Sequence, residues 1–234
     1  MDRTLLPSLK PQKSDMLQMG AGFVLAAVFL LEMGYLMVKY GIYTWRTDAP
    51  WLGLGPPLTA ALSVAVVEEI VFRGFIYGLL ARSMSATGAL WWTTGIFAAV
   101  HFMKPADGIM PLGSEVHLTT GFWLAGQILA NFAKVNFLLA EFLTLAAVGW
   151  ALTKARAVTG TLWLSIGLHA GWVFGLKYFS ALTKTSKAVR LGDHMPWFGE
   201  NLRVGLVSFL VVTLTGWLAI QAAPHLRRKQ PPIS

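Results

Sequence analysis

The stretch from Leu58 to Leu80 reads LTAALSVAVVEEIVFRGFIYGLL, and it decides how the rest of the chain is interpreted. It is apolar along almost its whole length, as expected of a helix that crosses the roughly 30 Å hydrocarbon core of a bilayer. It nevertheless contains Glu68, Glu69 and Arg73. Each charge near the middle of such a helix costs at least about 2.5 kcal/mol on insertion scales. We therefore predict a transmembrane helix whose charged residues have a structural or catalytic role inside the membrane.

The composition extends this interpretation to the whole chain. Of its 234 residues, 55% are hydrophobic and 13% are charged, whereas soluble domains carry roughly 25% charged residues. No polar segment is long enough to form a separate soluble domain, so we predict one integral membrane domain. The chain has no cysteine, which excludes disulfides, iron–sulfur clusters and thiol nucleophiles.

Further apolar segments predict an all-α, polytopic integral membrane protein with six to eight transmembrane or re-entrant helices. The region from about residue 119 to residue 154 leaves two alternatives open. It forms either a short or re-entrant helix near residues 122–132 followed by a span near 137–152, or one long tilted span. The other predicted spans are approximately residues 19–40, 58–80, 88–103, 159–179 and 202–222.

The two ends of the chain are short, polar and basic, and the net charge is +8. We predict a cytoplasmic N-terminal segment at residues 1–18, a transmembrane domain at 19–222 and a basic C-terminal tail at 223–234. The positive-inside rule places both termini in the cytoplasm. Basic ends on an apolar chain favour membrane lipids as partners and make nucleic acid a poor candidate. The small soluble portion favours the plasma (inner) membrane of a prokaryote.

The two neighbouring glutamates differ in what their own helix offers them. Glu69 and Arg73 are four residues apart, so they share a helix face and can form an ion pair. Glu68 is rotated by about 100° from Glu69 on an ideal helix, and its helix gives it no clear partner. The carboxylates either belong to a buried ion-pair cluster that joins helices, or include a base that takes a proton from water in a cavity.

Two histidines are candidate partners for Glu68. His101 lies near the end of a predicted span, in GIFAAVHF, and His169 lies within a later span, in SIGLHAGW. Neutral imidazoles can orient a water molecule, polarise a carbonyl group or bind a metal ion. The sequence has no His-Glu-x-x-His, no Gly-x-Ser-x-Gly and no aspartate within a span, so the usual zinc, serine and aspartyl solutions lack support. We also expect close helix packing at the glycines of the His169 span, Gly160, Gly167, Gly171 and Gly175.

These residues resemble the motifs of a known family. The run from Glu68 to Arg73 fits its Glu-Glu-x-x-x-Arg motif, Phe97 and His101 fit its Phe-x-x-x-His motif, and His169 fits the histidine of its third motif. The chain resembles the CPBP family of intramembrane proteases, which includes the CAAX prenyl proteases and bacteriocin-processing proteins. The resemblance covers a motif core from about residue 58 to residue 179.

The resemblance implies helices that surround a polar, water-filled cavity in which a peptide bond is hydrolysed. It implies that Glu68 is the general base, that His101 helps to hold the attacking water, and that His169 stabilises the oxyanion. Glu69, Arg73, Phe97 and Trp172 would be supporting residues. The family usually has asparagine four residues after this histidine, where the chain has Val173. Either His169 acts alone, or another donor reaches in, with Trp172 and the polar residues Gln127, Asn131 and Asn136 as candidates.

Cofactor and substrate follow from the same resemblance. We favour a glutamic-type mechanism with no cofactor, and the alternative is a zinc ion held by Glu68, His101 and His169. The implied partner is a membrane-bound peptide that is prenylated or carries a leader. Two other functions stay open: a catalytically altered membrane binding or immunity protein that uses the same cavity, and a small transporter or proton relay.

Overall fold

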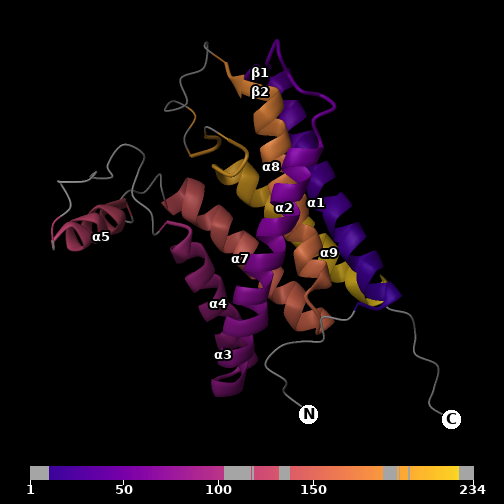
Figure 1. The fold of residues 1–234 in the computed structure, drawn as a ribbon, viewed down its shortest axis with the longest axis vertical. Helices are drawn as coiled ribbons and strands as arrows, with labels where there is room; N and C mark the ends of the chain where they lie inside the picture. The colour runs from indigo at the N-terminus through magenta and orange to yellow at the C-terminus, as the bar shows by residue number, and fades with distance from the viewer. Residues whose placement is uncertain are drawn as a thin grey trace.

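The computed structural model describes residues 11–102, 117, 119–131, 138–186, 194, 196–199 and 201–226. Most of the helices lie side by side along the long axis of the molecule and form one bundle (Figure 1), with α5 apart from it. The helices are α1 (Lys13–Lys39), α2 (Gly55–Glu69), a π-helical segment (Ile70–Ile76), α3 (Tyr77–Ser83), α4 (Ala86–Val100), α5 (Thr120–Asn131), a second π-helical segment (Leu138–Phe142), α7 (Leu143–Thr159), α8 (Trp163–Leu182) and α9 (Leu206–Leu226).

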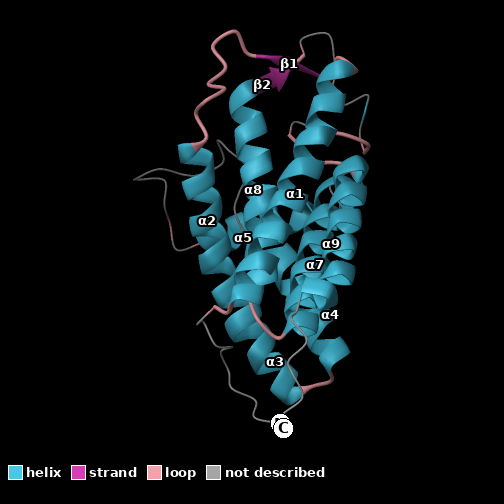
Figure 2. Ribbon diagram, turned by 90° about the vertical axis from the view of Figure 1, so that its right-hand side faces the viewer, coloured by secondary structure: helices cyan, strands magenta, loops and turns pink. Residues whose placement is uncertain are grey.

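The predicted all-α fold is nearly, but not completely, what the structure shows. Strands β1 (Tyr43–Trp45) and β2 (Thr183–Thr185) form a short antiparallel ribbon at one end of the bundle, opposite α3 (Figure 2). This ribbon joins the segment after α1 to the end of α8. Three-residue strands carry too little periodicity to be distinguished from loops in the sequence.

Small residues bring α1 and α8 into close contact. A methyl group added at Gly171 would lie 2.8 Å from Ala26 Cβ, and one added at Gly175 would lie 3.1 Å from Leu30 Cδ2. Gly167 faces the backbone of α1 at Met19 in the same way. The predicted packing role of these three glycines is confirmed, and it fixes the position of the helix that carries His169.

The prediction for Gly160 is wrong. This glycine ends α7 with φ of 74°, in the left-handed conformation that residues with a Cβ rarely adopt. Its N–H donates to the carbonyl oxygen of Arg156 at 3.0 Å. Gly160 therefore makes the turn into α8 and does not take part in the packing against α1.

The helix that carries the charged motif is longer and less regular than predicted. α2, the π-helical segment Ile70–Ile76 and α3 follow one another without a break. Glu69 is the last residue of α2, and Arg73 lies in the π-helical segment. Such wide turns are rare and often occur at functional sites, and no residue pattern in this stretch distinguishes one from an α-helix.

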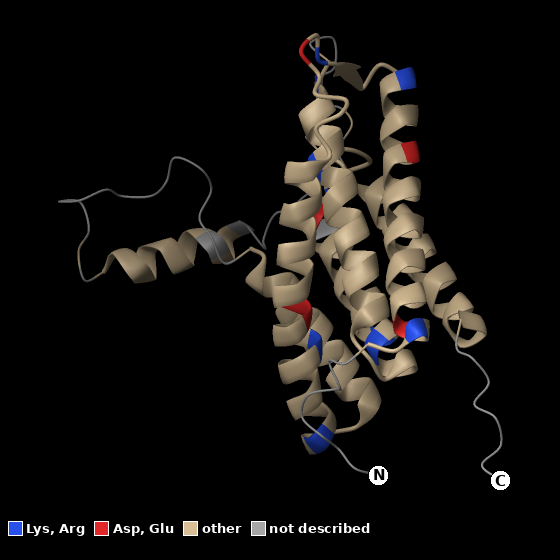
Figure 3. Ribbon diagram, turned by 45° about the vertical axis from the view of Figure 1, so that its right-hand side comes forward, with Lys and Arg blue, Asp and Glu red and all other residues tan. Residues whose placement is uncertain are grey.

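Of the two alternatives for residues 119–154, the structure supports separate helices. α5 ends at Asn131, and a second helical stretch begins at Leu138 and continues into α7. In Figures 1 and 3, α5 extends away from the bundle. The second stretch packs within the bundle against α4 and α9.

Two of the helices, α1 and α9, are long and apolar enough to cross a membrane by length and composition alone. α1 begins earlier than predicted, at Lys13, and α9 ends later, at Leu226. The start of α1 and the end of α9 lie at the same end of the bundle (Figure 1). Long stretches of the helices carry no charged residue (Figure 3), so the few charges inside the bundle are exceptional.

Candidate active site

Glu69 lies at the centre of a completely buried polar network. Its side chain and that of Arg73 are both 0% exposed, and Arg73 Nη1 donates to Glu69 Oε1 at 2.9 Å. The same oxygen accepts a hydrogen bond from His169 Nδ1, also at 2.9 Å. The ion pair expected from the four-residue spacing is therefore present, and the hydrogen bond from His169 links it to α8.

Arg73 extends this network to two further helices. Its Nη2 donates to the carbonyl oxygen of Gly149 at 3.1 Å, and its Nε donates to Thr153 Oγ1 at 3.4 Å. Its guanidinium carbon lies 4.2 Å from the centre of the Phe97 ring, a favourable cation–π distance. A buried ion pair is stable only with such additional partners, since both charges have lost their water.

Glu68 points to the other side, into a cavity. Its side chain is 28% exposed, and its Oε2 lies 3.6 Å from His101 Nε2 and 3.8 Å from His169 Nε2. Among the described residues, none forms a hydrogen bond with this oxygen, although the oxygen itself is buried. These separations exceed direct hydrogen bonds, but a single small molecule can contact all three atoms. The structure thus brings together the three residues predicted to be catalytic.

The hydrogen bonds of the two imidazoles decide which nitrogen faces Glu68 as an acceptor. His101 Nδ1 lies 2.8 Å from the carbonyl oxygen of Phe97, which can only accept, so Nδ1 carries the proton. His169 Nδ1 likewise donates to Glu69. In the neutral rings, both Nε2 atoms therefore present lone pairs toward Glu68 Oε2. A water molecule between these three acceptors can donate its two protons to two of them at a time, for example to Glu68 Oε2 and one of the Nε2 atoms.

Phe97 supports both sides of this arrangement. Its ring is 1% exposed and lies against Arg73 on one side. Its centre is 4.4 Å from that of the His101 ring and 6.2 Å from that of the His169 ring. The predicted supporting residue therefore packs against both Arg73 and His101, and it lies near His169.

The cavity around Glu68 has a volume of about 150 Å³ and is lined mainly by apolar side chains. Val173 lines it, one helical turn after His169, and offers no hydrogen-bond donor there. Trp172 also lines it, but its indole N–H donates to Thr215 Oγ1 of α9 at 3.1 Å. The candidate donor Trp172 is thus already committed to joining α8 and α9.

The other predicted donors come from the region around α5. Gln127 is exposed on α5, apart from the bundle (Figure 1), so it does not line the cavity. The side chain of Asn131 and all of Asn136 lie outside the described residues.

Sequence reasoning missed Arg203, which lines the same cavity as Glu68 and the two histidines. It lies in the turn before α9. An arginine at the edge of an apolar segment is expected at the membrane interface, so the sequence pattern does not distinguish it. Only the tertiary packing of that turn against the first part of α7 shows that the side chain faces the cavity.

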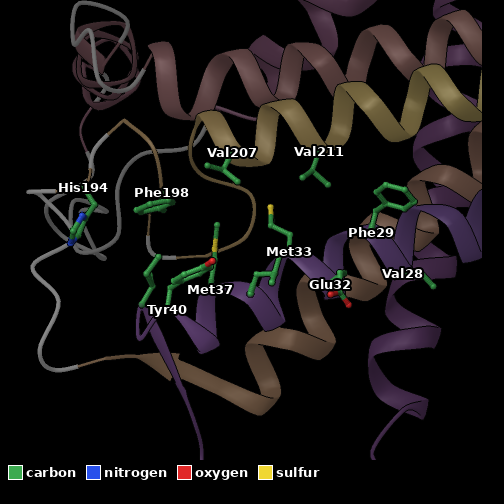
Figure 4. Close-up of a pocket in the computed structure, with 12 residues that line it drawn as sticks. Val28, Phe29, Glu32, Met33, Met37, Tyr40, His194, Phe198, Val207 and Val211 are labelled. Carbon is green, nitrogen blue, oxygen red and sulfur yellow. The ribbon is translucent and has the colours of Figure 1, made fainter.

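A second cavity, of about 750 Å³, lies between α1 and α9 near the ribbon end of the bundle. Met33 and Met37 of α1 face Val207 and Val211 of α9 across it (Figure 4). Glu32 also lines it, and none of the three predicted catalytic residues does. This apolar cavity is therefore separate from the one that contains Glu68.

The predicted zinc alternative depends on the geometry of the side chains around Glu68. Among the residues that the structure describes, no group of three or more His, Cys, Asp or Glu side chains has an arrangement suited to a metal ion. The three predicted zinc ligands nevertheless lie close together, with Glu68 Oε2 3.6 Å from His101 Nε2 and 3.8 Å from His169 Nε2.

A comparison with known protein families identifies the relatives of this chain. The family model "Type II CAAX prenyl endopeptidase Rce1-like" matches residues 50–175, which is more than half of the chain. The chain belongs to the Rce1-like family. The matched residues include Glu68, Glu69, His101 and His169, and the predicted resemblance is confirmed. No significant match was found among the curated proteins or among the solved structures. Membership makes this Rce1-like chain a membrane protein from a family of endopeptidases.

Proposed function

We propose that this chain is a glutamic-type intramembrane endopeptidase in which Glu68 activates water for attack on a peptide bond. The convergence of Glu68, His101 and His169 on one small cavity is the observation that carries the proposal. The apolar lining limits the number of water molecules near the reacting groups, and this strengthens electrostatic interactions there.

In the proposed reaction, a water molecule lies between Glu68 Oε2 and the two Nε2 atoms. Glu68 takes one proton, and the water oxygen attacks the carbonyl carbon of the peptide bond. The carbonyl oxygen becomes an oxyanion. When this intermediate collapses, the C–N bond breaks and the proton passes from Glu68 to the leaving nitrogen, which gives a carboxylic acid and an amine and leaves Glu68 as a carboxylate again.

The histidines have different positions in this scheme. His101 accepts a hydrogen bond from the water and is held by Phe97. His169 is held by Glu69, and it donates from Nε2 to the oxyanion only when both of its ring nitrogens carry protons. Glu69 and Arg73 act as positioning residues because they fix the orientation of His169 and the end of α2.

We propose a membrane-bound or lipid-modified peptide as substrate, either a prenylated C-terminal CAAX sequence or a peptide with a leader. The family description supports the first of these. Such a substrate would enter laterally between the six to eight helices of a prokaryotic plasma membrane protein. The start of α1 and the end of α9 lie at the same end of the bundle, which supports a common side of the membrane for both; the positive-inside rule favours the cytoplasmic side.

The experiment compares the wild-type protein with Glu68→Gln in liposomes, after both have been shown to unfold at the same temperature. A panel of prenylated CAAX peptides and a membrane extract are incubated with each, and new peptide termini are identified by mass spectrometry. We expect termini that form only with the wild-type protein, with turnover at least about 100-fold lower in the variant. Identical termini would show that the cavity has a binding function only.

The zinc alternative has its own readout in the same preparation. Metal analysis of the purified protein and turnover after treatment with a chelator distinguish the two mechanisms. We expect less than stoichiometric zinc and unchanged turnover. One zinc per chain, with activity lost on chelation and restored by zinc, would replace the metal-free mechanism.

A further inference from the structure

Attack of water on a peptide carbonyl places negative charge on its oxygen, and catalysis depends on hydrogen-bond donors directed at that oxygen. Most hydrogen-bond donors in the Glu68 cavity already donate to other groups of the protein. The indole of Trp172 donates to Thr215, and the single hydroxyl proton of Thr144 is shared between the carbonyl oxygens of Ala140 and Gly205. The neutral histidines use their ring protons on Phe97 and Glu69.

Arg203 is different, because its guanidinium group forms no hydrogen bond or ion pair with the residues that the structure describes. The side chain is half-buried and lines the cavity. Within the described part of the chain, its hydrogen bonding is limited to its backbone N–H, which donates to Asn201 Oδ1 at 2.9 Å. Its positive charge is close enough to His101 to act on that ring electrostatically. A guanidinium group in a mainly apolar cavity provides up to five N–H donors.

The turn that carries Arg203 is attached to the second π-helical segment, at Ala140, and to the start of α7, at Thr144. The N–H of Gly205 donates to the carbonyl oxygen of Ala140 at 2.6 Å, and Thr144 Oγ1 lies 3.2 Å from the carbonyl oxygen of Gly205. Gly205 has φ of 123°, which residues with a Cβ rarely adopt, and a Cβ added there would collide with the backbone of Trp197. These contacts fix the backbone from which the Arg203 side chain extends, and donors held in place before the reaction cost little reorganisation during it.

We infer that Arg203 is a catalytic residue that donates hydrogen bonds to the oxyanion formed in the Glu68 cavity. This inference rests on the proposed endopeptidase function. In the step concerned, the electron pair of the carbonyl π bond moves to oxygen as the water oxygen binds the carbon and its proton passes to Glu68. Arg203 stabilises this charge without losing a proton, and the charge returns to the C=O bond when the C–N bond breaks.

The same guanidinium group could instead bind the terminal carboxylate of a peptide, and kinetics separate these roles. A donor to the oxyanion acts mainly in the transition state and therefore on kcat, whereas a donor to a substrate carboxylate acts on KM. A peptide with an amidated C-terminus lacks that carboxylate but forms the same oxyanion. Comparison of the free and amidated peptides is thus part of the test.

The experiment measures kcat and KM of Arg203→Met, Arg203→Lys and Arg203→Met/Val173→Asn in liposomes, with a peptide that the wild-type protein cleaves. Arg46→Met is the matched control, because Arg46 is exposed and pairs with Asp48 away from the cavity. For Arg203→Met we expect kcat to fall about 100- to 1,000-fold with KM nearly unchanged. The lysine variant should keep part of the activity, and the new amide in the double variant should restore part of it. Unfolding temperatures of all variants are compared with that of the wild-type protein.

Three results would overturn the inference. Wild-type kcat in Arg203→Met, alongside an inactive Glu68→Gln, would remove the role of Arg203 and leave the endopeptidase proposal intact. A rise in KM that is confined to the peptide with a free carboxylate would assign Arg203 to substrate recognition. Wild-type turnover in Glu68→Gln would contradict the proposed function itself, and the inference with it.

Discussion

Glu68 and Glu69 are neighbours in the chain, yet their carboxylates lie in opposite surroundings. Glu69 is fully buried and accepts hydrogen bonds from Arg73 and His169. Glu68 is partly exposed in a cavity and faces two imidazole nitrogens without a direct hydrogen bond. The difference shows how a membrane helix can contain two adjacent charges: one is neutralised within the protein, and the other is kept available for chemistry.

His169 connects these two regions. Its Nδ1 donates to Glu69 and its Nε2 faces Glu68. A change in the buried network therefore reaches the cavity through a single ring. This makes the buried network a positioning device for the reacting groups, in addition to its role in joining helices.

The largest effect is expected from Arg73→Met, which tests whether the buried region is mainly structural. The variant leaves the Glu69 carboxylate buried without its cation, which costs about 3–5 kcal/mol of stability. We expect a large fall in the unfolding temperature in detergent together with loss of turnover. The double variant Glu69→Gln/Arg73→Met removes both charges and should regain part of the stability. An unfolding temperature like that of the wild-type protein in Arg73→Met would contradict the structural role.

Much of the buried region follows from the sequence, because a four-residue spacing places Glu69 and Arg73 on the same helix face whatever the rest of the fold is. The prediction that Glu68, His101 and His169 lie close together rests on the family motifs. No local pattern in the sequence shows that the three helices that carry them meet. The contact of His169 with Glu69 depends on the packing of α8 against α2, and the position of Arg203 depends on a turn far away in the sequence. Long-range packing of this kind leaves no periodic pattern.

A smaller effect is expected from substitution of either histidine. The two variants compare the buried region around Glu69 with the cavity around Glu68. His169→Leu removes a donor from buried Glu69, so it should lower the free energy of unfolding by about 1–3 kcal/mol as well as turnover. His101 is 23% exposed and its ring is bonded only to the carbonyl oxygen of Phe97 among the described residues. His101→Leu should therefore lower turnover while changing stability much less. Equal losses of stability in the two variants would mean that both histidines belong to the buried network.

The smallest effect is expected from Glu32→Gln. This variant tests whether a carboxylate on a membrane helix outside the Glu68 cavity contributes to catalysis. Glu32 is exposed on α1 and lines the apolar cavity between α1 and α9 (Figure 4), away from Glu68. No ion pair or hydrogen bond forms at its side chain among the described residues. Loss of its charge thus leaves no partner unpaired, and we expect wild-type turnover and an unchanged unfolding temperature in the assay used for Glu68→Gln. A fall in turnover as large as that of Glu68→Gln would show that the two cavities act together, and the contrast between Glu68 and the other carboxylates would no longer explain the chemistry.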